Sequence, residues 1–408
     1  MGLCASAPII DEEAAARTLS IETMCEDSFR ESCASLNMLC LGPSASGKAT
    51  FLKQMVMLFG KSKDGAVASK PGFRKPEIAH FKRLIQMTTI ANMKELVEQA
   101  PNYFSEGILD VQAGQVFEYI SEDEMFDENI EILLLRLWSD PGIQAAYAHA
   151  HEFGLADSAG FFFQHETLQI LSSPKYVPST DHILRVQEKK NGLVSRRFVV
   201  DAVQYTYYDV SAQNNRKKKW IANFQDDIHL IMFFVGLDQF DEPSRQNQTV
   251  DGVTHAMAEF LEVLEEKSLS AFPILLVFNR HDVFCKKIQS IPPWEYAPHG
   301  DDDSKGGGAE PAVDEDGVMD LGADAEPKGP WDDAFEFCSG YDDLEAGCTA
   351  YFVQKFMDIA MYCKRSSKYK YAPPIETCVS SLLNEESVRQ VFHKTQGMLL
   401  GGKKGHKH

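Results

Sequence analysis

The sequence predicts an α/β protein in which an open sheet is flanked by helices and carries an inserted all-helical domain. A glycine-rich segment, residues 42–48, follows an apolar, strand-like run and precedes a helical pattern. Residues 62–180 are helical in pattern, without a convincing strand. After about residue 198, apolar strands alternate with helices. This alternation is typical of an open sheet that binds its ligand at the carboxyl ends of its strands.

The composition is that of an ordinary globular protein. The chain has 408 residues, of which 44% are hydrophobic and 25% charged, and this length suffices for more than one domain. No apolar run reaches the roughly 18 residues that span a bilayer. The net charge of −20 argues against nucleic-acid binding, which requires a basic face. The nine cysteines form no C-x-x-C pair, which predicts neither a zinc site nor a disulfide framework and favours a reducing, intracellular location.

The first residues fit a lipid-modification pattern. Gly2 follows Met1, and Ser6 lies at the position that the myristoylation pattern requires. Cys4 beside them is a candidate for palmitoylation. Two acyl chains make a stable membrane anchor, whereas one gives only marginal affinity. An unmodified, disordered start is the alternative. Residues 11–33 then have the pattern of a polar helix without an apolar stripe, which is more typical of a helix that lies on a partner.

Residues 42–48 match the phosphate-binding pattern G-x-x-x-x-G-K. Gly42 and Gly47 supply the glycines, and Lys48 is placed to reach the outer phosphates of a nucleotide. The N–H groups of such a loop and the positive end of the helix dipole form a cradle for anions. The next residue should be Ser or Thr, whose hydroxyl binds Mg²⁺, but it is Ala49, and Thr50 comes one residue late. A purely structural glycine turn is the alternative.

The remaining elements support the open sheet. Residues 228–235 form a near-continuous apolar run, as in a strand that is buried on both faces of a parallel sheet. Predicted strands lie at residues 198–200, 205–208, 228–235, 272–278 and near Ile375, and predicted helices at residues 253–264, 350–361 and 386–400.

Residues 300–329 differ from their surroundings. They are acidic, rich in glycine and poor in large apolar groups, so they cannot bury enough surface to offset the entropy lost on ordering. We expect a disordered acidic insertion here, either a solvated loop without function or a docking site. The last eight residues are expected to be mobile as well.

A second chemical signal follows the strand predicted at residues 272–278. In the motif Asn-Arg-His-Asp at residues 279–282, Asp282 is placed to accept two N–H groups from guanine, which would select guanine over adenine. Arg280 stands where a lysine is usual, and its aliphatic stem is expected to pack along the base. Residues 377–380 are expected to offer a backbone N–H to the guanine oxygen. Each signal alone is weak, because Asn and Asp are common in turns.

In this order and spacing, the motifs resemble those of the alpha subunits of heterotrimeric G proteins over most of the chain. Residues 137–144 and 155–158 resemble the signatures of that family's helical domain. Residues 183–185 resemble the segment that enters switch I, and residues 209–213 resemble switch II. Residues 300–329 and the last eight residues fall outside the resemblance.

The resemblance implies a division of the chain. Residues 1–35 would form an acylated N-terminal helix. Residues 36–61 and 181–408 would form a Ras-like nucleotide-binding domain of the P-loop GTPase type, with residues 300–329 as an insertion. Residues 62–180 would form the inserted helical domain.

The resemblance also implies a site for GTP or GDP. Gln213 would position the attacking water, and Asp209 would contact Mg²⁺ through a water molecule. The nucleotide-binding positions carried over from the family are Gly42, Ala45, Ser46, Gly47, Lys48, Ala49, Thr50, Ser158, Leu184, Arg185, Asn279, Asp282, Cys378 and Val379.

Several positions depart from the family's pattern. The arginine-finger position carries Gln187. The switch I threonine that binds magnesium in the family is replaced by Lys190. The Lys190 ammonium either substitutes for the metal or faces solvent. Because Ala49 also lacks a hydroxyl group, both direct protein ligands of the metal are missing. The paired glycines of switch II are Ser211 and Ala212, and a Cβ at the second should hinder its contact with the γ-phosphate. We therefore expect slow or absent hydrolysis and doubtful dependence on Mg²⁺.

The sequence leaves more than one hypothesis of function open. The first is a signalling subunit, tethered to the cytoplasmic face of the plasma membrane, that binds guanine nucleotide and hydrolyses it weakly. The second is a pseudo-GTPase scaffold for beta-gamma or effector partners, with little or no nucleotide. A small-molecule kinase is a third, but it explains neither residues 279–282 nor the acylation pattern.

The resemblance implies partners too. The N-terminal helix and residues 217–220 would contact a beta-gamma dimer. The C-terminal helix, residues 391–400, would face a G-protein-coupled receptor, although the chain lacks the short apolar finish that is typical of the family. The downstream effector is not implied by any residue.

Overall fold

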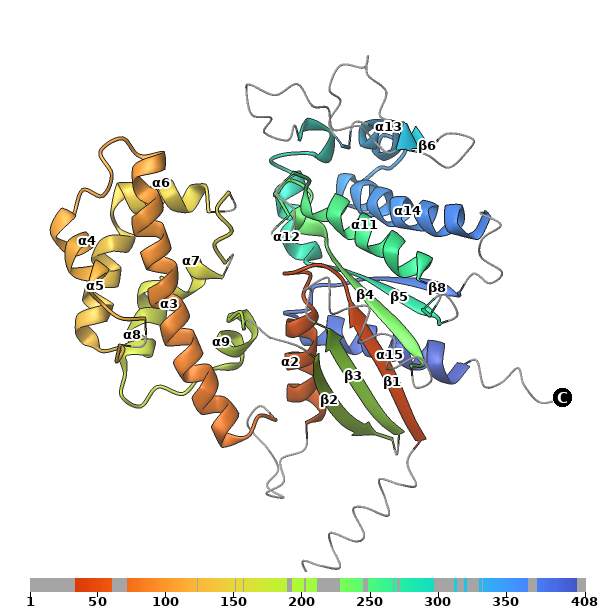
Figure 1. Cartoon of the computed structure of the whole chain (residues 1–408), viewed down its shortest axis with the longest axis horizontal. Coiled ribbons are helices and arrows are strands. Elements are labelled where there is room, and N and C mark those ends of the chain that lie inside the picture. The colour runs from red at the N-terminus through yellow and green to blue at the C-terminus, as the bar shows by residue number, and fades with distance from the viewer. Residues whose placement is uncertain are drawn as a thin grey trace, which may run out of the picture.

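A computed structural model describes residues 34–60, 72–188, 193–210, 228–296, 330–365 and 373–401, together with the backbone of residues 312–313 and 319–320. Within these ranges, residues 123, 151, 157, 202, 245–248, 267, 270–271 and 332 are not described. Figure 1 shows a helical domain on the left and a sheet with its covering helices on the right. The predicted N-terminal helix and the acylation residues Gly2 and Cys4 lie outside the described residues.

The sheet has six strands in the order β2-β3-β1-β4-β5-β8. All neighbours are parallel except β2 and β3, which pair antiparallel along residues 193–200 and 203–210. The strands are β1 (Ala34–Leu41), β2 (Leu193–Val200), β3 (Val203–Val210), β4 (Leu230–Gly236), β5 (Ile274–Asn279) and β8 (Ile375–Val379).

Side chains of the central strands alternate between two cores, because successive residues of a strand point to opposite faces. In β1, Met38 and Cys40 join one core, while Leu39 and Leu41 join the other. The first core is covered by α2 and α15, and the second by α11, α12 and α14. The predicted α/β fold with helices on both faces of an open sheet is therefore confirmed.

The helices that accompany the sheet extend the predicted ones at both ends. The helix predicted at residues 350–361, for example, begins six residues earlier, at Leu344. These helices are α2 (Lys48–Phe59), α11 (Gly252–Glu265), α12 (His281–Ile288), α13 (Ala334–Cys338), α14 (Leu344–Arg365) and α15 (Glu385–Gly401), with short 3-10 turns at η1 (Leu237–Gln239) and η2 (Pro293–Glu295).

The helical domain lies between α2 and β2 in the chain. Its long helix α3 runs beside the shorter ones, several of which begin at a side chain that caps the first turn, such as Asp127 and Asp140. The helices are α3 (Lys75–Tyr103), α4 (Val111–Glu118), α5 (Glu128–Trp138), α6 (Pro141–Ala148), α7 (Ala159–Phe162), α8 (His165–Ser172) and α9 (Thr180–Arg185). The predicted boundaries at residues 62 and 180 stay predictions.

Within residues 300–329, four residues are ordered into a ladder. β6 (Ala312–Val313) and β7 (Met319–Asp320) pair antiparallel. The sequence did not predict this pairing, in which two short strands satisfy each other's backbone hydrogen bonds, and the disorder expected of the insertion stays a prediction. The rest of the insertion lies outside the described residues.

Among the described residues, no helix is both long enough and apolar enough to cross a membrane.

We predict that Tyr207→Phe stabilises the protein. Tyr207 in β3 is fully buried beside Phe51, and its hydroxyl has no hydrogen-bond partner. Because an unpaired buried polar group costs about 1–3 kcal/mol, removing it should raise the free energy of unfolding by roughly 1 kcal/mol. Urea unfolding measures this. The matched control is Tyr205→Phe, which should destabilise, because the Tyr205 hydroxyl accepts a hydrogen bond from Gln396 at 3.1 Å. Stabilisation by both variants would contradict this explanation.

We also predict a pH dependence that originates at His182 in α9. Burial lowers the pKa of His182 below 6.5, with Asp181 opposing the shift. Below pH 6.5 the unfolded chain therefore binds a proton at this ring more readily than the folded chain, so stability is present above that pH and is lost as the pH falls. Urea unfolding from pH 7.5 to 5.5 should show this loss, and His182→Gln should reduce it. If His182→Gln and a variant of the exposed His165 have the same effect, the assignment is wrong.

Candidate functional site

The loop between β1 and α2 has a backbone that depends on residues with positive φ. Gly42, Ala45 and Gly47 have φ values of 126°, 61° and 101°. A Cβ at Gly42 would lie 2.3 Å from the backbone oxygen of Phe234, and one at Gly47 would lie 2.0 Å from Nδ2 of Asn279. The predicted phosphate loop is therefore packed against the carboxyl ends of β4 and β5 in a conformation that needs both glycines.

Lys48 lies inside this loop. Its Nζ donates hydrogen bonds to the backbone oxygens of Gly42 and Pro43 at 2.5 and 2.6 Å, and to the hydroxyl of Ser46 at 3.3 Å. The Ser46 hydroxyl donates in turn to the Pro43 oxygen at 2.9 Å. The loop thus surrounds a largely buried ammonium group, which places a positive charge at its centre.

The first turn of α2 is open to an anion. α2 begins at Gly47 without a side-chain cap, as α7, α8 and α12 also do, whereas α4, α5, α6, α9 and α11 each begin with a side chain that accepts a hydrogen bond from a first-turn N–H. Its first turn also has no acidic residue. The N–H groups at a helix start have no intrahelical partner, so this helix presents donors and the positive end of its dipole beside Lys48.

The amide of Asn279 connects three of the predicted segments. Its Nδ2 donates to the backbone oxygen of Ser46 at 3.1 Å, and its Oδ1 accepts from the N–H of Leu382 at 2.9 Å. Asn279 is 3% exposed. The loop before α2, the end of β5 and the loop after β8 are therefore joined through one buried side chain.

Asp282 lies next to this junction, with its carboxylate exposed in the first turn of α12. Its N–H donates to the hydroxyl of Ser381 at 3.1 Å, which ties it to the loop after β8. Arg280 has a φ of 61°, and its guanidinium forms an ion pair with the buried Asp238 at 2.6 Å. This pair fixes the head of Arg280, whose packing along a base stays a prediction.

Cys378 and Val379 end β8 and lie opposite Val277 and Phe278 of β5. The N–H of the following Ser380 donates to the Phe278 oxygen at 2.7 Å. Burial raises the pKa of the Cys378 thiol, and Lys394 opposes the shift. The thiol at this position is thus kept neutral, and the segment contributes backbone geometry rather than charge.

The predicted residues of the helical side gather around α9. Leu184 is buried, and the Arg185 guanidinium lies over the Phe161 ring at 4.6 Å. Ser158 begins α7, the helix that contains Phe161. Lys53 of α2 donates to the backbone oxygens of Ile183 and Val186 at 2.8 and 2.6 Å. α9 is thereby held directly to the helix that follows the phosphate loop.

Position 49 offers no side-chain ligand to a magnesium ion. The side chain of Ala49 is a methyl group, which offers no oxygen. Asp209 is buried near the end of β3 and stands opposite Cys40 in the sheet. Gln187 is exposed just after α9, and Lys190 and Gln213 lie outside the described residues. Among the described residues, no group of three or more His, Cys, Asp or Glu side chains is arranged to hold a metal.

Two residues that make contacts in this region, Asp238 and Lys53, were not predicted from the sequence. Asp238 lies two residues after the end of β4, in η1, and the rule that ligands bind at the carboxyl ends of parallel strands points to that position. Lys53 had no comparable signal, because its partners lie about 130 residues away in the chain.

Comparison with known proteins gives one consistent result. A locust protein named guanine nucleotide-binding protein G(o) subunit alpha is 27% identical over 72% of this chain and 80% of its own length. A protein of Coprinellus congregatus named guanine nucleotide-binding protein subunit alpha is 27% identical over 70% of this chain and 78% of its own length. The guanine nucleotide-binding protein G(o) subunit alpha of Caenorhabditis elegans is 26% identical over 69% of this chain and 78% of its own length. The family model described as G-protein alpha subunit matches residues 15–399. The chain therefore belongs to the G-protein alpha subunit family.

Proposed function

We propose that this chain is a signalling subunit that binds guanine nucleotide and hydrolyses GTP slowly or not at all. The observation that carries the proposal is the buried amide of Asn279, which joins the loop around Lys48 to the loop after β8 and leaves the carboxylate of Asp282 exposed beside them. The relatives named above are guanine nucleotide-binding proteins by name, which supports the same conclusion.

The phosphates of the nucleotide would lie at the start of α2. The uncapped N–H groups and the ammonium of Lys48 supply positive charge there. The Asp282 carboxylate would accept the two N–H groups of the guanine edge, and the end of β8 at Cys378 and Val379 would meet its oxygen. Ser158 of the helical domain and Leu184 and Arg185 of α9 would close the site.

Hydrolysis would be slow because the charge that stabilises the transition state is missing. In GTPases, G-protein alpha subunits among them, an arginine finger accelerates hydrolysis by roughly 10³–10⁵-fold. That position is Gln187 in this chain. Gln213 would still orient a water molecule, but orientation alone does not neutralise the developing charge.

Magnesium would contribute little to binding. When bound in related sites, the ion neutralises charge on the outer phosphates. Here the direct-ligand positions are Ala49 and Lys190, so only Asp209 would remain, through water. Lys48, held by the Gly42 and Pro43 oxygens, would supply the main positive charge at the phosphates.

The location and partners of the chain are part of the same proposal. Acylation at Gly2 and Cys4 would tether it to the cytoplasmic face of the plasma membrane, because two acyl chains give stable binding. A beta-gamma dimer would bind the N-terminal helix and residues 217–220, and α15 would face a receptor.

A second candidate function is a scaffold that binds beta-gamma or effector partners without nucleotide. The methyl group of Ala49 and the exposed Gln187 favour it, since several positions of the hydrolytic site have changed together. The two candidates differ in one measurable property, which is nucleotide affinity.

The deciding experiment is equilibrium binding of fluorescent GDP and of a slowly hydrolysed GTP analogue, with and without Mg²⁺. We expect tight binding of both, with affinities that change little on adding Mg²⁺. Ala49→Ser restores one hydroxyl ligand and should make binding of the GTP analogue dependent on Mg²⁺.

The variant Asp282→Asn tests whether Asp282 recognises the guanine base. It should lose affinity for guanine nucleotides and gain affinity for xanthine nucleotides, because the amide presents a donor where xanthine has a carbonyl. Binding of the GTP analogue by the unmodified chain only with Mg²⁺ would overturn the interpretation of Ala49 and Lys190. If neither nucleotide binds under any of these conditions, the scaffold function is favoured instead.

A further prediction concerns the rate of hydrolysis. Gln187→Arg should raise the single-turnover rate of phosphate release by about 10³-fold, since it restores the charge that the transition state requires. Gln187→Ala serves as the control and should leave the rate unchanged. An equal rate in all three proteins would show that residue 187 does not face the γ-phosphate.

A further inference from the structure

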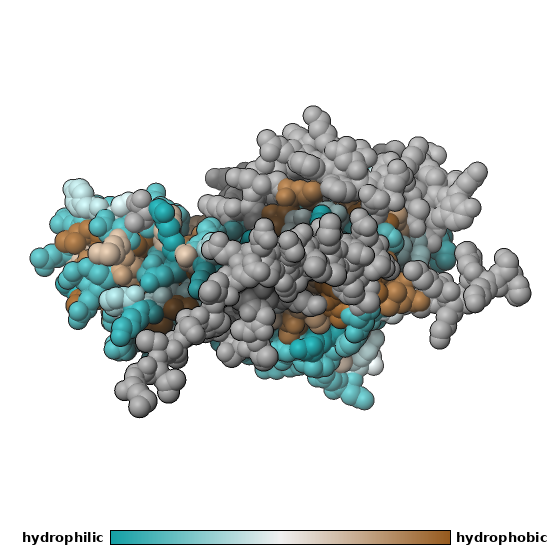
Figure 2. Space-filling model, turned by 90° about the horizontal axis from the view of Figure 1, so that it is seen from below, coloured by the Kyte–Doolittle hydropathy of each residue, from teal (hydrophilic) through white to brown (hydrophobic). Residues whose placement is uncertain are grey.

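The outer end of the helical domain presents apolar side chains that the nucleotide site does not use. Tyr119 is 90% exposed and Met125 is 79% exposed, although large apolar side chains are normally buried. The exposed apolar residues in and beside α4 are Leu109, Val111, Val116, Tyr119 and Met125. Figure 2 shows apolar residues among hydrophilic ones on this end of the molecule, at the left. Such patches mark interaction sites when they are contiguous.

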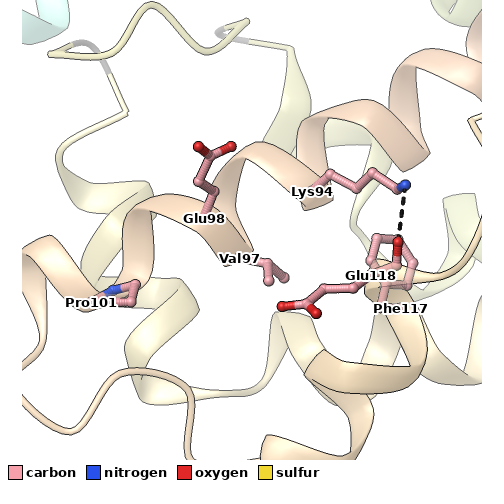
Figure 3. A pocket seen from close by; sticks show the side chains of 6 residues that line it. All are labelled: Lys94, Val97, Glu98, Pro101, Phe117 and Glu118. Carbon is pink, nitrogen blue, oxygen red and sulfur yellow. Dashed lines mark hydrogen bonds between the residues drawn. The ribbon is translucent and has the colours of Figure 1, made fainter.

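A cavity of about 420 Å³ opens between α3 and α4, the helix that contains Val111 and Val116. The buried side chains of Val97 and Phe117 line it, together with Pro101. Figure 3 shows the carboxylates of Glu98 and Glu118 on either side of Val97. Lys94 is the sixth residue that lines the cavity, after Val97, Glu98, Pro101, Phe117 and Glu118. We refer to these six residues, together with the five exposed apolar residues named above, as the α3–α4 surface.

The α3–α4 surface lies within an acidic segment of the chain. Residues 94–131 contain eleven Asp or Glu and a single basic residue, Lys94. Lys94 donates to the backbone oxygen of Glu118 at 3.4 Å. Within the described chain, neither Glu98 nor Glu118 forms an ion pair. The carboxylates at the cavity are therefore available to positive charge from outside the molecule.

We propose that the α3–α4 surface binds a basic amphipathic helix of a partner protein. An apolar side chain of that helix enters the cavity against Val97 and Phe117, and its Lys or Arg side chains meet Glu98 and Glu118. An apolar groove with an acidic rim is complementary in shape and charge to such a helix. The same charge repels an anionic membrane, so the occupant is a protein. This inference does not depend on nucleotide binding.

The test uses the full chain and a fluorescein-labelled model peptide of Leu and Lys, about 18 residues long and so about five helical turns, with Leu on one face. Fluorescence anisotropy measures its dissociation constant. Glu98→Lys combined with Glu118→Lys should weaken binding about tenfold, since two attractions become repulsions. Tyr119→Ser combined with Met125→Ser should also weaken it, because apolar contact is lost. Hydrogen exchange should slow at residues 94–101 and 111–119 when the peptide is bound.

Two controls make the test decisive. Glu262→Lys combined with Glu265→Lys changes the net charge equally at exposed positions of α11 in the other domain, and should leave the affinity unchanged. A peptide of the same composition without an apolar face should bind more weakly. Equal weakening by both charge variants, equal affinity of both peptides, or no binding by the unmodified chain would overturn the proposal.

Discussion

The buried amide of Asn279 is the contact on which the arrangement of the site depends. It satisfies one backbone oxygen of the phosphate loop and one N–H of the loop after β8, both in the interior. If the amide were removed, each group would stay buried without this partner, at a cost of about 1–3 kcal/mol apiece. Asn279 also requires Gly47, because any Cβ at that position would lie 2.0 Å from its Nδ2. The amide at position 279 in β5 is therefore compatible only with glycine at position 47 in the β1–α2 loop.

A second buried contact relates the helical domain to the sheet. Lys53 is 5% exposed, and its ammonium lies near the Phe81 ring and donates to two backbone oxygens at the end of α9. Cations are favourable at a helix C-terminus, where the last oxygens lack intrahelical partners. The end of α9 is thus fixed to α2 by contacts made within the protein.

The sequence predicted the sheet and its helices because their signals are local. The apolar run of β4 predicts a strand from a few consecutive residues. The glycines at positions 42 and 47 likewise predict a turn before a helix. The sequence did not predict the pairing of Arg280 with Asp238 or of Lys53 with α9, because those contacts join residues that are distant in the chain. The ladder at residues 312–313 and 319–320 was missed because its acidic, glycine-rich surroundings lack strand periodicity. The departures at Ala49 and Gln187 were visible in the sequence, but their consequence for catalysis depends on residues outside the described ones.

The acidic charge of the helical domain has a consequence for how the molecule orients. Residues 94–131 carry a net charge of −10, half of the chain's −20 in a small part of its length. This charge lies at the end of the molecule where α4 and α5 lie (Figure 1), and residues 300–329 carry a further net charge of −8. A negatively charged surface therefore repels this end of the molecule, and the repulsion weakens beyond about 10 Å at moderate ionic strength. Salt concentration thus controls how sharply the molecule is oriented, even where it does not change how much of it is bound.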